Sequence, residues 1–304
     1  MGGPNRFSPP PRKIALAGAT GFIGEALSER YRQKGYEIKM ISRRPGHISW
    51  DDPAAITEAL NRADLLVNLA GRSVNCRYNE QNRREIMESR TTTTQTLGEA
   101  IADCSHPPKL WINSGTATIY RDARDRPMTE EQGELGSGFS VEVAKAWEET
   151  FFAANTPSTR KAVLRIAIAL GRGGGVMTPY INLIRFGLGG KQGPGSQRFS
   201  WVHIDDLCRM VEFLEKRTDL SGAFNASAPE QVTNAEQMRT MREAYGRRFG
   251  LPAPAWMLKA GAAVIRTETE LILKSRWVAP ERLIREGFEF HYPTLREAMK
   301  EIAR

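Results

Sequence analysis

The chain has 304 residues, long enough for one large domain or a domain with a smaller lobe, and it carries a formal charge of +8 at pH 7 with a pI of about 9.5. Its basic residues never run beyond two in succession and are not interleaved with aromatic ones, so we expect a solvated basic surface with some anion-binding arginines and no nucleic-acid partner. Three cysteines without a C-x-x-C pair or a His-Cys cluster indicate a reducing compartment, the cytoplasm, and no metal site. The sequence has no run of 18 uncharged apolar residues, so we expect no membrane span.

Residues 1–12 contain four prolines and no apolar core, which predicts a disordered tail rather than a secretory signal. Over residues 13–228, short apolar strands alternate with helical patterns, of which 79–102 and 139–151 are the clearest. Strands separated by helices predict an α/β fold of the Rossmann type, with a doubly wound parallel sheet between two layers of helices. The first five strands are expected at Lys13–Ala17, Glu37–Ser42, Ala63–Ala70, Leu110–Ser114 and Ala162–Leu170.

The sequence changes character after the fifth strand, because residues 171–198 contain nine glycines among 28 residues. We interpret them as a loop, a helix near Met177–Phe186 and a second loop. The whole segment is either a surface connection or a mobile lid over a substrate. A strand, a helix and a strand follow over 201–226. Residues 229–304 are interpreted as a small, mainly helical C-terminal lobe, whose last helix has a capping box at Thr294 and Glu297.

A glycine motif joins the first strand to the first helix, as G-x-x-G-x-x-G at Gly18, Gly21 and Gly24. In the order strand, turn, helix, such a motif is typical of a dinucleotide site rather than of a turn without a ligand. Gly18 allows the tight turn, Gly21 lets a diphosphate approach the backbone, and Gly24 lets helix and strand pack closely. The helix start offers free N–H groups and a positive dipole end to the phosphates.

In doubly wound sheets, ligands bind at the carboxyl ends of the strands. This rule selects the segments Ser42–Arg44, Ala70–Arg72 with Gly71, and Ser114–Thr116, as well as the residues after Ala167. At the end of the second strand, NAD-selective sites usually carry a carboxylate, which holds the ribose 2′-hydroxyl. Here Arg43 lies 19 residues beyond Gly24 and is followed by another arginine, Arg44. A guanidinium attracts a 2′-phosphate, so the sequence predicts NADP(H) rather than NAD(H).

Eight short stretches, in order along nearly the whole chain, together resemble the extended short-chain dehydrogenase/reductase superfamily. More narrowly, the chain resembles its atypical, NAD(P)-dependent epimerase-like branch with a small C-terminal domain of unknown function. The resemblance rests on the sequences G-A-T-G-F-I-G, S-R-R-P-G, N-L-A-G, E-I-M-E-S-R, S-G-T-A-T-I-Y, L-G-R-G-G-G, W-V-H-I-D-D-L and G-F-E-F-H-Y-P-T-L.

The resemblance implies roles for individual residues in holding the cofactor. The diphosphate would be wrapped by Gly18, Thr20, Gly21, Phe22 and Ile23, and the 2′-phosphate would be held by Ser42 and Arg43. Leu69 and Ala70 would lie under the adenosine-side ribose and the diphosphate, and Ile168 would lie near the nicotinamide. Glu85 and Arg90, on the long helix, match cofactor-facing positions.

Enzymes of this superfamily generally use a Ser or Thr together with a Tyr and a Lys four residues apart on one helix face. The ammonium lowers the pKa of the phenol, which moves the proton that accompanies hydride transfer. By resemblance Thr116 takes the Ser/Thr position and Lys145 the lysine position, where it also contacts the ribose, but Val141 stands where the tyrosine belongs. Tyr120 and His203 are the candidate replacements; the alternative for Tyr120 is a packed aromatic, and His203 in this sequence context is more typical of a residue that packs or caps near Asp205.

Three functions are compatible with these features. The first is an NADP(H)-dependent oxidoreductase that acts on an unknown carbonyl or alcohol substrate, as a monomer or homodimer. The second is an NADP(H)-binding sensor or docking protein without catalysis, which the missing tyrosine favours. The third is a nucleotide-sugar epimerase or dehydratase, whose anionic substrate would pair with basic residues of the glycine-rich region, namely Arg172, Arg185, Lys191 and Arg198.

Overall fold

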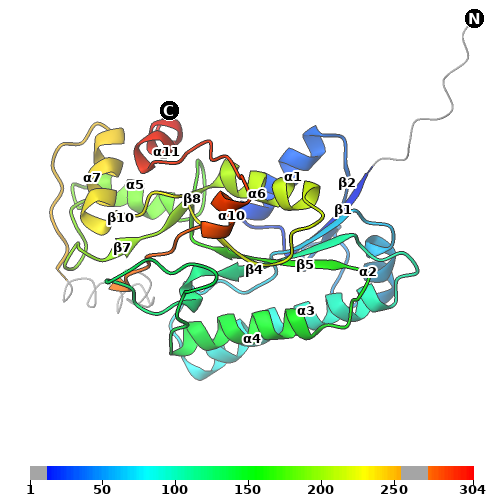
Figure 1. Cartoon of the computed structure of the whole chain (residues 1–304). Coiled ribbons are helices and arrows are strands. Elements are labelled where there is room, and N and C mark those ends of the chain that lie inside the picture. Colours follow the sequence, from blue (N-terminus) through cyan, green and yellow to red (C-terminus); the bar gives the residue numbers. More distant parts are fainter. Residues whose placement is uncertain (1–11, 255–272) are drawn as a thin grey trace, which may run out of the picture.

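The computed structural model describes residues 12–254 and 273–304, so the predicted N-terminal tail lies almost wholly outside the described residues. The centre of the molecule is a sheet of six parallel strands in the order β2-β1-β3-β4-β5-β9. This confirms the predicted Rossmann-type, doubly wound fold (Figure 1). The strands are β1 (Lys13–Ala17), β2 (Glu37–Ile41), β3 (Leu65–Asn68), β4 (Leu110–Thr116), β5 (Arg160–Ile166) and β9 (Gly222–Ala226).

The inner strands β1, β3 and β4 are mostly apolar because both faces of the sheet are covered there, whereas the edge strand β2 carries Glu37 and Lys39. In β1, Ile14 and Leu16 belong to the core on one face, and Ala15 and Ala17 belong to the core on the other. All four side chains are fully buried. Strand order reverses between β1 and β3, which places a crevice at the carboxyl end of β1, where the glycine motif begins.

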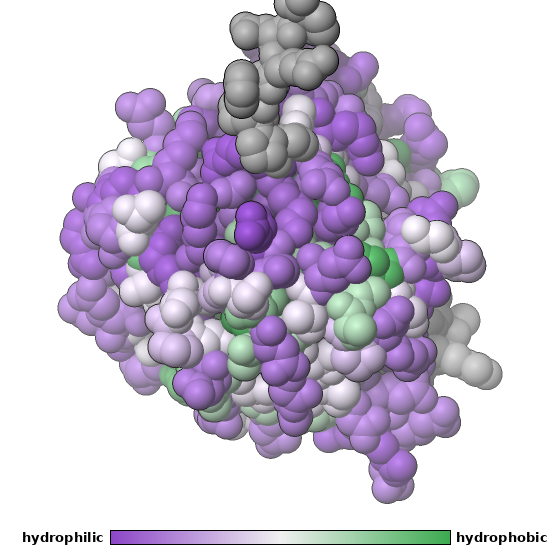
Figure 2. Space-filling model, turned by 90° about the vertical axis from the view of Figure 1, so that its right-hand side faces the viewer, coloured by the Kyte–Doolittle hydropathy of each residue, from purple (hydrophilic) through white to green (hydrophobic). Residues whose placement is uncertain are grey.

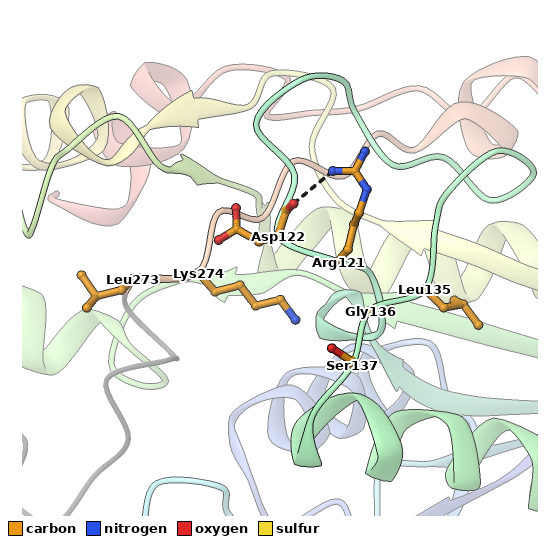
Figure 3. A pocket seen from close by; sticks show the side chains of 7 residues that line it. All are labelled: Arg121, Asp122, Leu135, Gly136, Ser137, Leu273 and Lys274. Atoms are coloured by element: carbon orange, nitrogen blue, oxygen red, sulfur yellow. Dashed lines mark hydrogen bonds between the residues drawn. The ribbon is translucent and has the colours of Figure 1, made fainter.

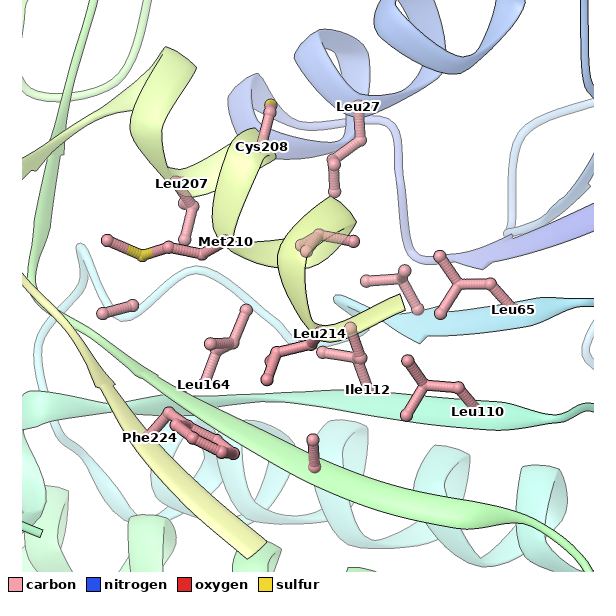
Figure 4. Packing of buried hydrophobic residues seen from close by; sticks show 14 of the residues in the cluster. Leu27, Leu65, Leu110, Ile112, Leu164, Leu207, Cys208, Met210, Leu214 and Phe224 are labelled. Carbon is pink, nitrogen blue, oxygen red and sulfur yellow. The ribbon is translucent and has the colours of Figure 1, made fainter. Parts of the chain in front are cut away.

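Helices α1 (Phe22–Gln33) and α6 (Ile204–Lys216) cover one face of the sheet, and Leu27 and Leu214 belong to the same core as Ile112 of the sheet (Figure 4). The opposite face is covered by α2 (Pro53–Leu60), α3 (Glu80–Ala102) and α4 (Phe139–Ala153), as Figure 1 shows. The three helices on that face enclose the aromatic pair Trp111 and Phe151. The sheet is thus packed between two cores, one under each layer of helices.

The predicted fifth strand is divided into two. β5 ends at Ile166, and after Ala167 the chain leaves the main sheet as β6 (Ile168–Leu170), which pairs with β8 (Trp201–His203). Ala167 still donates its N–H to Ala226 of β9, whereas the N–H of Ile168 already bonds to Ser200. The division turns Ile168 away from the main sheet and toward the C-terminal part of the chain.

A second layer joins the glycine-rich segment to the C-terminal residues. β7 (Arg198–Phe199) pairs with β10 (Val232–Thr233), and a third core holds α5 (Met177–Arg185), α7 (Asn234–Ala244) and α11 (Leu295–Ile302) together. The short helices η1 (Ala117–Ile119) and α10 (Glu281–Arg285) complete the described elements. The predicted capping box of Thr294 and Glu297 is confirmed at the start of α11. Leu283 of α10 belongs to the core of the main sheet, so the C-terminal residues share their cores with earlier ones; the boundary at 229 stays a prediction.

The described helices include none with the length and apolarity that crossing a membrane requires. The face shown in Figure 2 is mostly hydrophilic, with small apolar areas between polar side chains.

Candidate functional site: a glycine cradle beside a cavity between α3 and α4

Residues 18–24 form a turn that we call the glycine cradle. Gly18 has a φ of +69°, and a Cβ atom there would lie 2.4 Å from Cα of Ala70, at the end of β3. A Cβ at Gly24 would lie 2.3 Å from Cα of Ala19. Both positions therefore require glycine for close packing of backbone on backbone.

Gly21 differs, because a Cβ atom there would meet nothing within 4 Å. It is the N-cap of α1, and no described side chain caps the first turn of that helix. Uncapped N–H groups beside open space are the features that a diphosphate uses at a helix N-terminus, so the cradle fits the predicted group. Thr20 is exposed at the same turn, and Ile23 packs on the sheet core.

Phe22 connects the cradle to the glycine-rich segment. Its ring lies against Gly171 and Gly174, where added Cβ atoms would approach it to 2.8 and 2.5 Å. The same segment is held to α11 by an ion pair of 2.9 Å between Arg172 and Glu301. Residues 171–174 thus cover the start of α1; that they act as a lid stays a prediction.

The turn after β2 presents two arginines to solvent. Arg43 and Arg44 are exposed, and within the described residues neither guanidinium has a hydrogen bond or an ion pair. Ser42 is buried, and its Oγ accepts from the backbone N–H of Arg44 at 3.0 Å. Its Oγ also shares a hydrogen bond of 2.8 Å with Nδ1 of His47, a neighbour that sequence reasoning missed. The turn is closed by a bond of 3.0 Å from the N–H of Ser42 to the carbonyl of Ile48.

A buried polar network lies under the end of β3. Asn68 donates to Asn113 at 2.7 Å and to Thr94 at 3.1 Å, and its Oδ1 accepts from the N–H of Ala70 at 3.0 Å. Thr94 also accepts from the indole N–H of Trp147 at 3.0 Å. The network holds the segment Leu69–Gly71 in place from below, which suits a segment expected to support the cofactor.

The two helix residues implied by resemblance are in different environments. Glu85 forms an ion pair with Arg72 and accepts a hydrogen bond from Gln81 at 2.9 Å. Arg90 is half-buried, donates to the carbonyl of Ile86 at 2.9 Å, and lies 5.1 Å from the centre of the Trp147 ring. A Cβ atom added at Gly71 would lie 3.0 Å from Cζ of Arg90, so the Arg90 side chain reaches the segment after β3. Burial lowers the pKa of Arg90 to about 10.

Beside Arg90 lies a hollow of about 120 Å³ that we call the α3–α4 cavity. Its polar lining comes from Tyr78 before α3 and Arg90 on α3, and from three hydroxyl residues, Thr116, Thr118 and Ser140. Apolar side chains such as Ile86 and Trp147 form most of the remaining wall. The structure thus brings Thr116 and Arg90 into one site.

The lysine predicted for catalysis does not line this cavity. Lys145 donates to the carbonyl of Gly136 at 3.3 Å, and Gly136 belongs to a separate open groove of about 570 Å³ beside Lys274 (Figure 3). The α4 residues that do line the cavity include the four-apart pair Ser140 and Ala144. Val141, which stands where the usual tyrosine is expected, is fully buried.

Tyr120 is held in a buried network rather than in the cavity. It is 1% exposed; its hydroxyl donates to Asn225 at 2.9 Å and accepts from Arg165 at 2.8 Å. Arg165 in turn makes two bonds with the carboxylate of Glu148, at 2.9 and 2.7 Å. Burial raises the pKa of Tyr120. This environment favours a stabilising role over proton transfer.

His203 caps α6, since its Nδ1 accepts from the N–H of Asp205 at 3.2 Å. Its Nε2 lies 3.1 Å from Glu301, and burial lowers the pKa of the imidazole. Among the described residues, one group could geometrically hold a metal ion: Asp205, Asp206 and His291. Two guanidiniums already bind these carboxylates, because Asp205 pairs with Arg30 at 2.6 Å and Asp206 pairs with Arg209 at 3.1 Å.

Ser114, expected at the cofactor-binding end of the fourth strand, and Ile168, expected near the nicotinamide, line different small hollows. Ser114 lies with Ile23 and Leu69 between α1 and the sheet. Ile168 lies with Arg198 and Arg276 beside the second layer, where two guanidiniums supply positive charge.

Sequence reasoning missed Tyr78 and Asn68. Asn68 had a local signal, since it is the polar residue that ends an otherwise apolar strand, L-L-V-N. Tyr78 had none, because only the fold brings it beside Thr116.

The fold is that of the Rossmann-type dinucleotide-binding proteins. More narrowly, the chain belongs to the NAD dependent epimerase/dehydratase family, which matches residues 14–226; residues 253–302 match DUF1731, a domain of unknown function. Human epimerase family protein SDR39U1 is 35% identical over 297 residues, which cover 95% of this chain and 99% of the human one. These matches confirm the family that the motifs indicated.

Two solved structures are similar over 96% of this chain. The crystal structure of human SDR39U1 (isoform 2) with NADPH has a TM-score of 0.88 at 34% identity and is covered to 99% of its length. The nucleoside-diphosphate sugar epimerase from Corynebacterium glutamicum has a TM-score of 0.75 at 29% identity and is covered to 58%. The NADPH in the human structure agrees with the cofactor predicted from Ser42–Arg44.

Proposed function

We propose that this protein binds NADP(H) and acts as an oxidoreductase on a carbonyl or alcohol substrate. The observation that carries the proposal is the combination of the uncapped glycine cradle with two arginines, unpaired among the described residues, at the end of the neighbouring strand. One element suits a diphosphate and the other a 2′-phosphate. The NADPH in the structure of human SDR39U1 supports the same assignment.

The chain's own residues would hold the cofactor along the carboxyl edge of the sheet. The N–H groups at the start of α1 would bind the diphosphate, and Ser42 and Arg43 would bind the 2′-phosphate. Ala70 and Gly71 would lie under the ribose, with Arg90 beside them. The bound cofactor supplies hydride chemistry, and Thr116 offers a hydroxyl to a substrate oxygen.

The assignment is tested by titrating NADPH and NADH into the wild type and into Arg43→Ala. Losing a charge-assisted contact costs about 1.5–3 kcal/mol, so we expect the affinity for NADPH to fall roughly tenfold to a hundredfold. The affinity for NADH should change little, since it has no 2′-phosphate. The exposed arginine Arg247 provides a control, and Arg247→Ala should change neither value. An equal loss for both coenzymes would contradict the role of Arg43.

A second candidate is an NADP(H)-binding protein without catalysis. The buried Val141 and the fully engaged hydroxyl of Tyr120 favour it. Tight NADPH binding without oxidation by any of a panel of carbonyl compounds would support this candidate. Conversion of a nucleotide sugar without net use of cofactor would instead support an epimerase, the activity after which the C. glutamicum protein is named.

A reducing compartment such as the cytoplasm is part of the same proposal. It is supported by Cys76, Cys104 and Cys208, all of which are free thiols.

A further inference from the structure

We propose that the α3–α4 cavity binds a small aldehyde or ketone, and that Tyr78 donates the proton to its carbonyl oxygen in place of the tyrosine that α4 lacks. This inference rests on the proposed oxidoreductase function and adds to it a site, a proton donor and a substrate class. Three observations carry it: the position of the Tyr78 ring, the charge beside it, and the size and lining of the cavity.

The ring of Tyr78 is fixed by the two helices that form the cavity. Tyr78 directly precedes Asn79, the N-cap of α3. Its ring packs edge to face on Phe139, the first residue of α4, with centroids 5.0 Å apart and planes at 67°. The same Phe139 ring lies 4.7 Å from the guanidinium of Arg83. Tyr78 is therefore clamped between α3 and α4 while its side chain lines the cavity together with Thr116.

Arg90 provides the positive charge beside this phenol. No carboxylate pairs with Arg90 within the described residues, and Tyr78 is the one group whose charge opposes the lowering of its pKa by burial. A phenolate formed at Tyr78 would thus face a half-buried cation, which stabilises the negative charge. In the superfamily that the sequence resembles, a lysine four residues after the tyrosine stabilises the phenolate. In this chain the cation comes from α3, and the phenol comes from the loop before α3.

Thr116 completes the arrangement. Its Oγ1 already accepts from the N–H of Thr118 at 3.2 Å, so its own proton is available to a substrate oxygen. In the reduction, the carbonyl carbon gains a hydride from the reduced cofactor, and the carbonyl oxygen takes the phenolic proton of Tyr78. The phenolate then regains a proton from water, so atoms and charges balance over the cycle.

The size and lining of the cavity define the substrate class. A volume of about 120 Å³ is close to that of an apolar cavity of about 150 Å³ which binds benzene. The walls contributed by Ile86, Val143 and Trp147 are apolar. An aryl ring or a short branched alkyl chain next to the carbonyl suits this volume and these apolar walls.

The first test measures NADPH oxidation with benzaldehyde, acetophenone and isobutyraldehyde for the wild type, Tyr78→Phe and Tyr245→Phe. Removing a general acid lowers kcat by about 10²–10⁴-fold. We expect that loss for Tyr78→Phe, with little change in KM or in the NADPH dissociation constant. Tyr245 ends α7, outside the cavity, and its variant should match the wild type. Equal kcat values for Tyr78→Phe and the wild type would refute the role of Tyr78 and leave the proposed function standing.

The second test needs no turnover. Alkaline titration of phenol absorbance in the wild type minus that in Tyr78→Phe isolates the ionisation of this one phenol. In an Arg90→Met background the midpoint should move up by about one pH unit, because the cation is gone. An unchanged midpoint would refute the pairing of Tyr78 with Arg90. Bound NADPH that no carbonyl compound oxidises in the wild type would instead refute the oxidoreductase function itself.

Discussion

The glycine cradle and the α3–α4 cavity are connected through the segment after β3, where Ala70 lies against Gly18 and Gly71 lies against Arg90, but they are built in opposite ways. The cradle is made by seven consecutive residues, and its working parts are backbone atoms and missing side chains. The cavity is lined by residues from five places in the chain: the loop before α3, α3 itself, the end of β4, η1 and α4. A site made of local backbone tolerates changes everywhere except at its glycines, whereas a site made of distant side chains depends on the packing of the whole layer.

Gly18 is a position where the backbone around the cradle leaves no room for a side chain. We expect Gly18→Ala to lower the free energy of unfolding by about 3 kcal/mol, from roughly 1–2 kcal/mol of backbone strain and roughly 1–3 kcal/mol of overpacking. Gly35→Ala is the matched control, because Gly35 also has a positive φ but would place its Cβ in open space. Urea unfolding should show a loss of about 1 kcal/mol for the control, from backbone strain alone. Equal losses would mean that contact with Ala70 does not restrict the cradle.

Asn68 connects the two regions, because its hydrogen-bond network reaches both of them. It holds Ala70 of the cradle floor directly, and it holds Trp147 of the cavity wall through Thr94. Asn68→Ala leaves buried partners without a hydrogen bond, at a cost of about 2 kcal/mol. Affinity for NADPH should fall as well. Asn182→Ala, at an exposed position on α5, should stay within about 0.5 kcal/mol of the wild type in the same unfolding experiment. A variant that loses stability but binds NADPH normally would separate the two regions.

Lowering the pH tests the contact between His203, which caps α6, and Glu301 of α11, which lies outside both regions. We expect the smallest effect on stability here. The pKa of His203 is lowered by burial, so the imidazole stays neutral in the folded protein while the unfolded chain protonates it below about pH 6.5. The unfolded state then binds more protons, and stability falls as the pH drops from about 6.5 toward the folded pKa. His203→Asn, which can still cap α6, should show a shallower fall in urea midpoints between about pH 7 and pH 5. Parallel pH profiles would exclude His203 as the cause.

The sequence predicts the parts of this molecule that depend on local patterns. Apolar runs and helical spacing place the strands and helices, and the glycine spacing with Arg43 locates the cradle and the charge beside it. The break at Ala167 escapes this reasoning, because the choice between β9 and β8 as partner is made by tertiary contacts. The side of α4 that faces Thr116 escapes it for the same reason. The resemblance pointed to Val141 and Lys145 on α4, whereas the fold presents Ser140 and Ala144 to the cavity.

The ring of Phe22 fills the space that a side chain at Gly174 would need, since an added Cβ would lie 2.5 Å from Cδ2 of that ring. The two positions, 152 residues apart, therefore share a single volume. Among related chains we expect bulk at one of them to be exchanged for bulk at the other. An aromatic residue that shrinks at 22 frees 174 to accept a methyl group, so the pair should drift together through evolution.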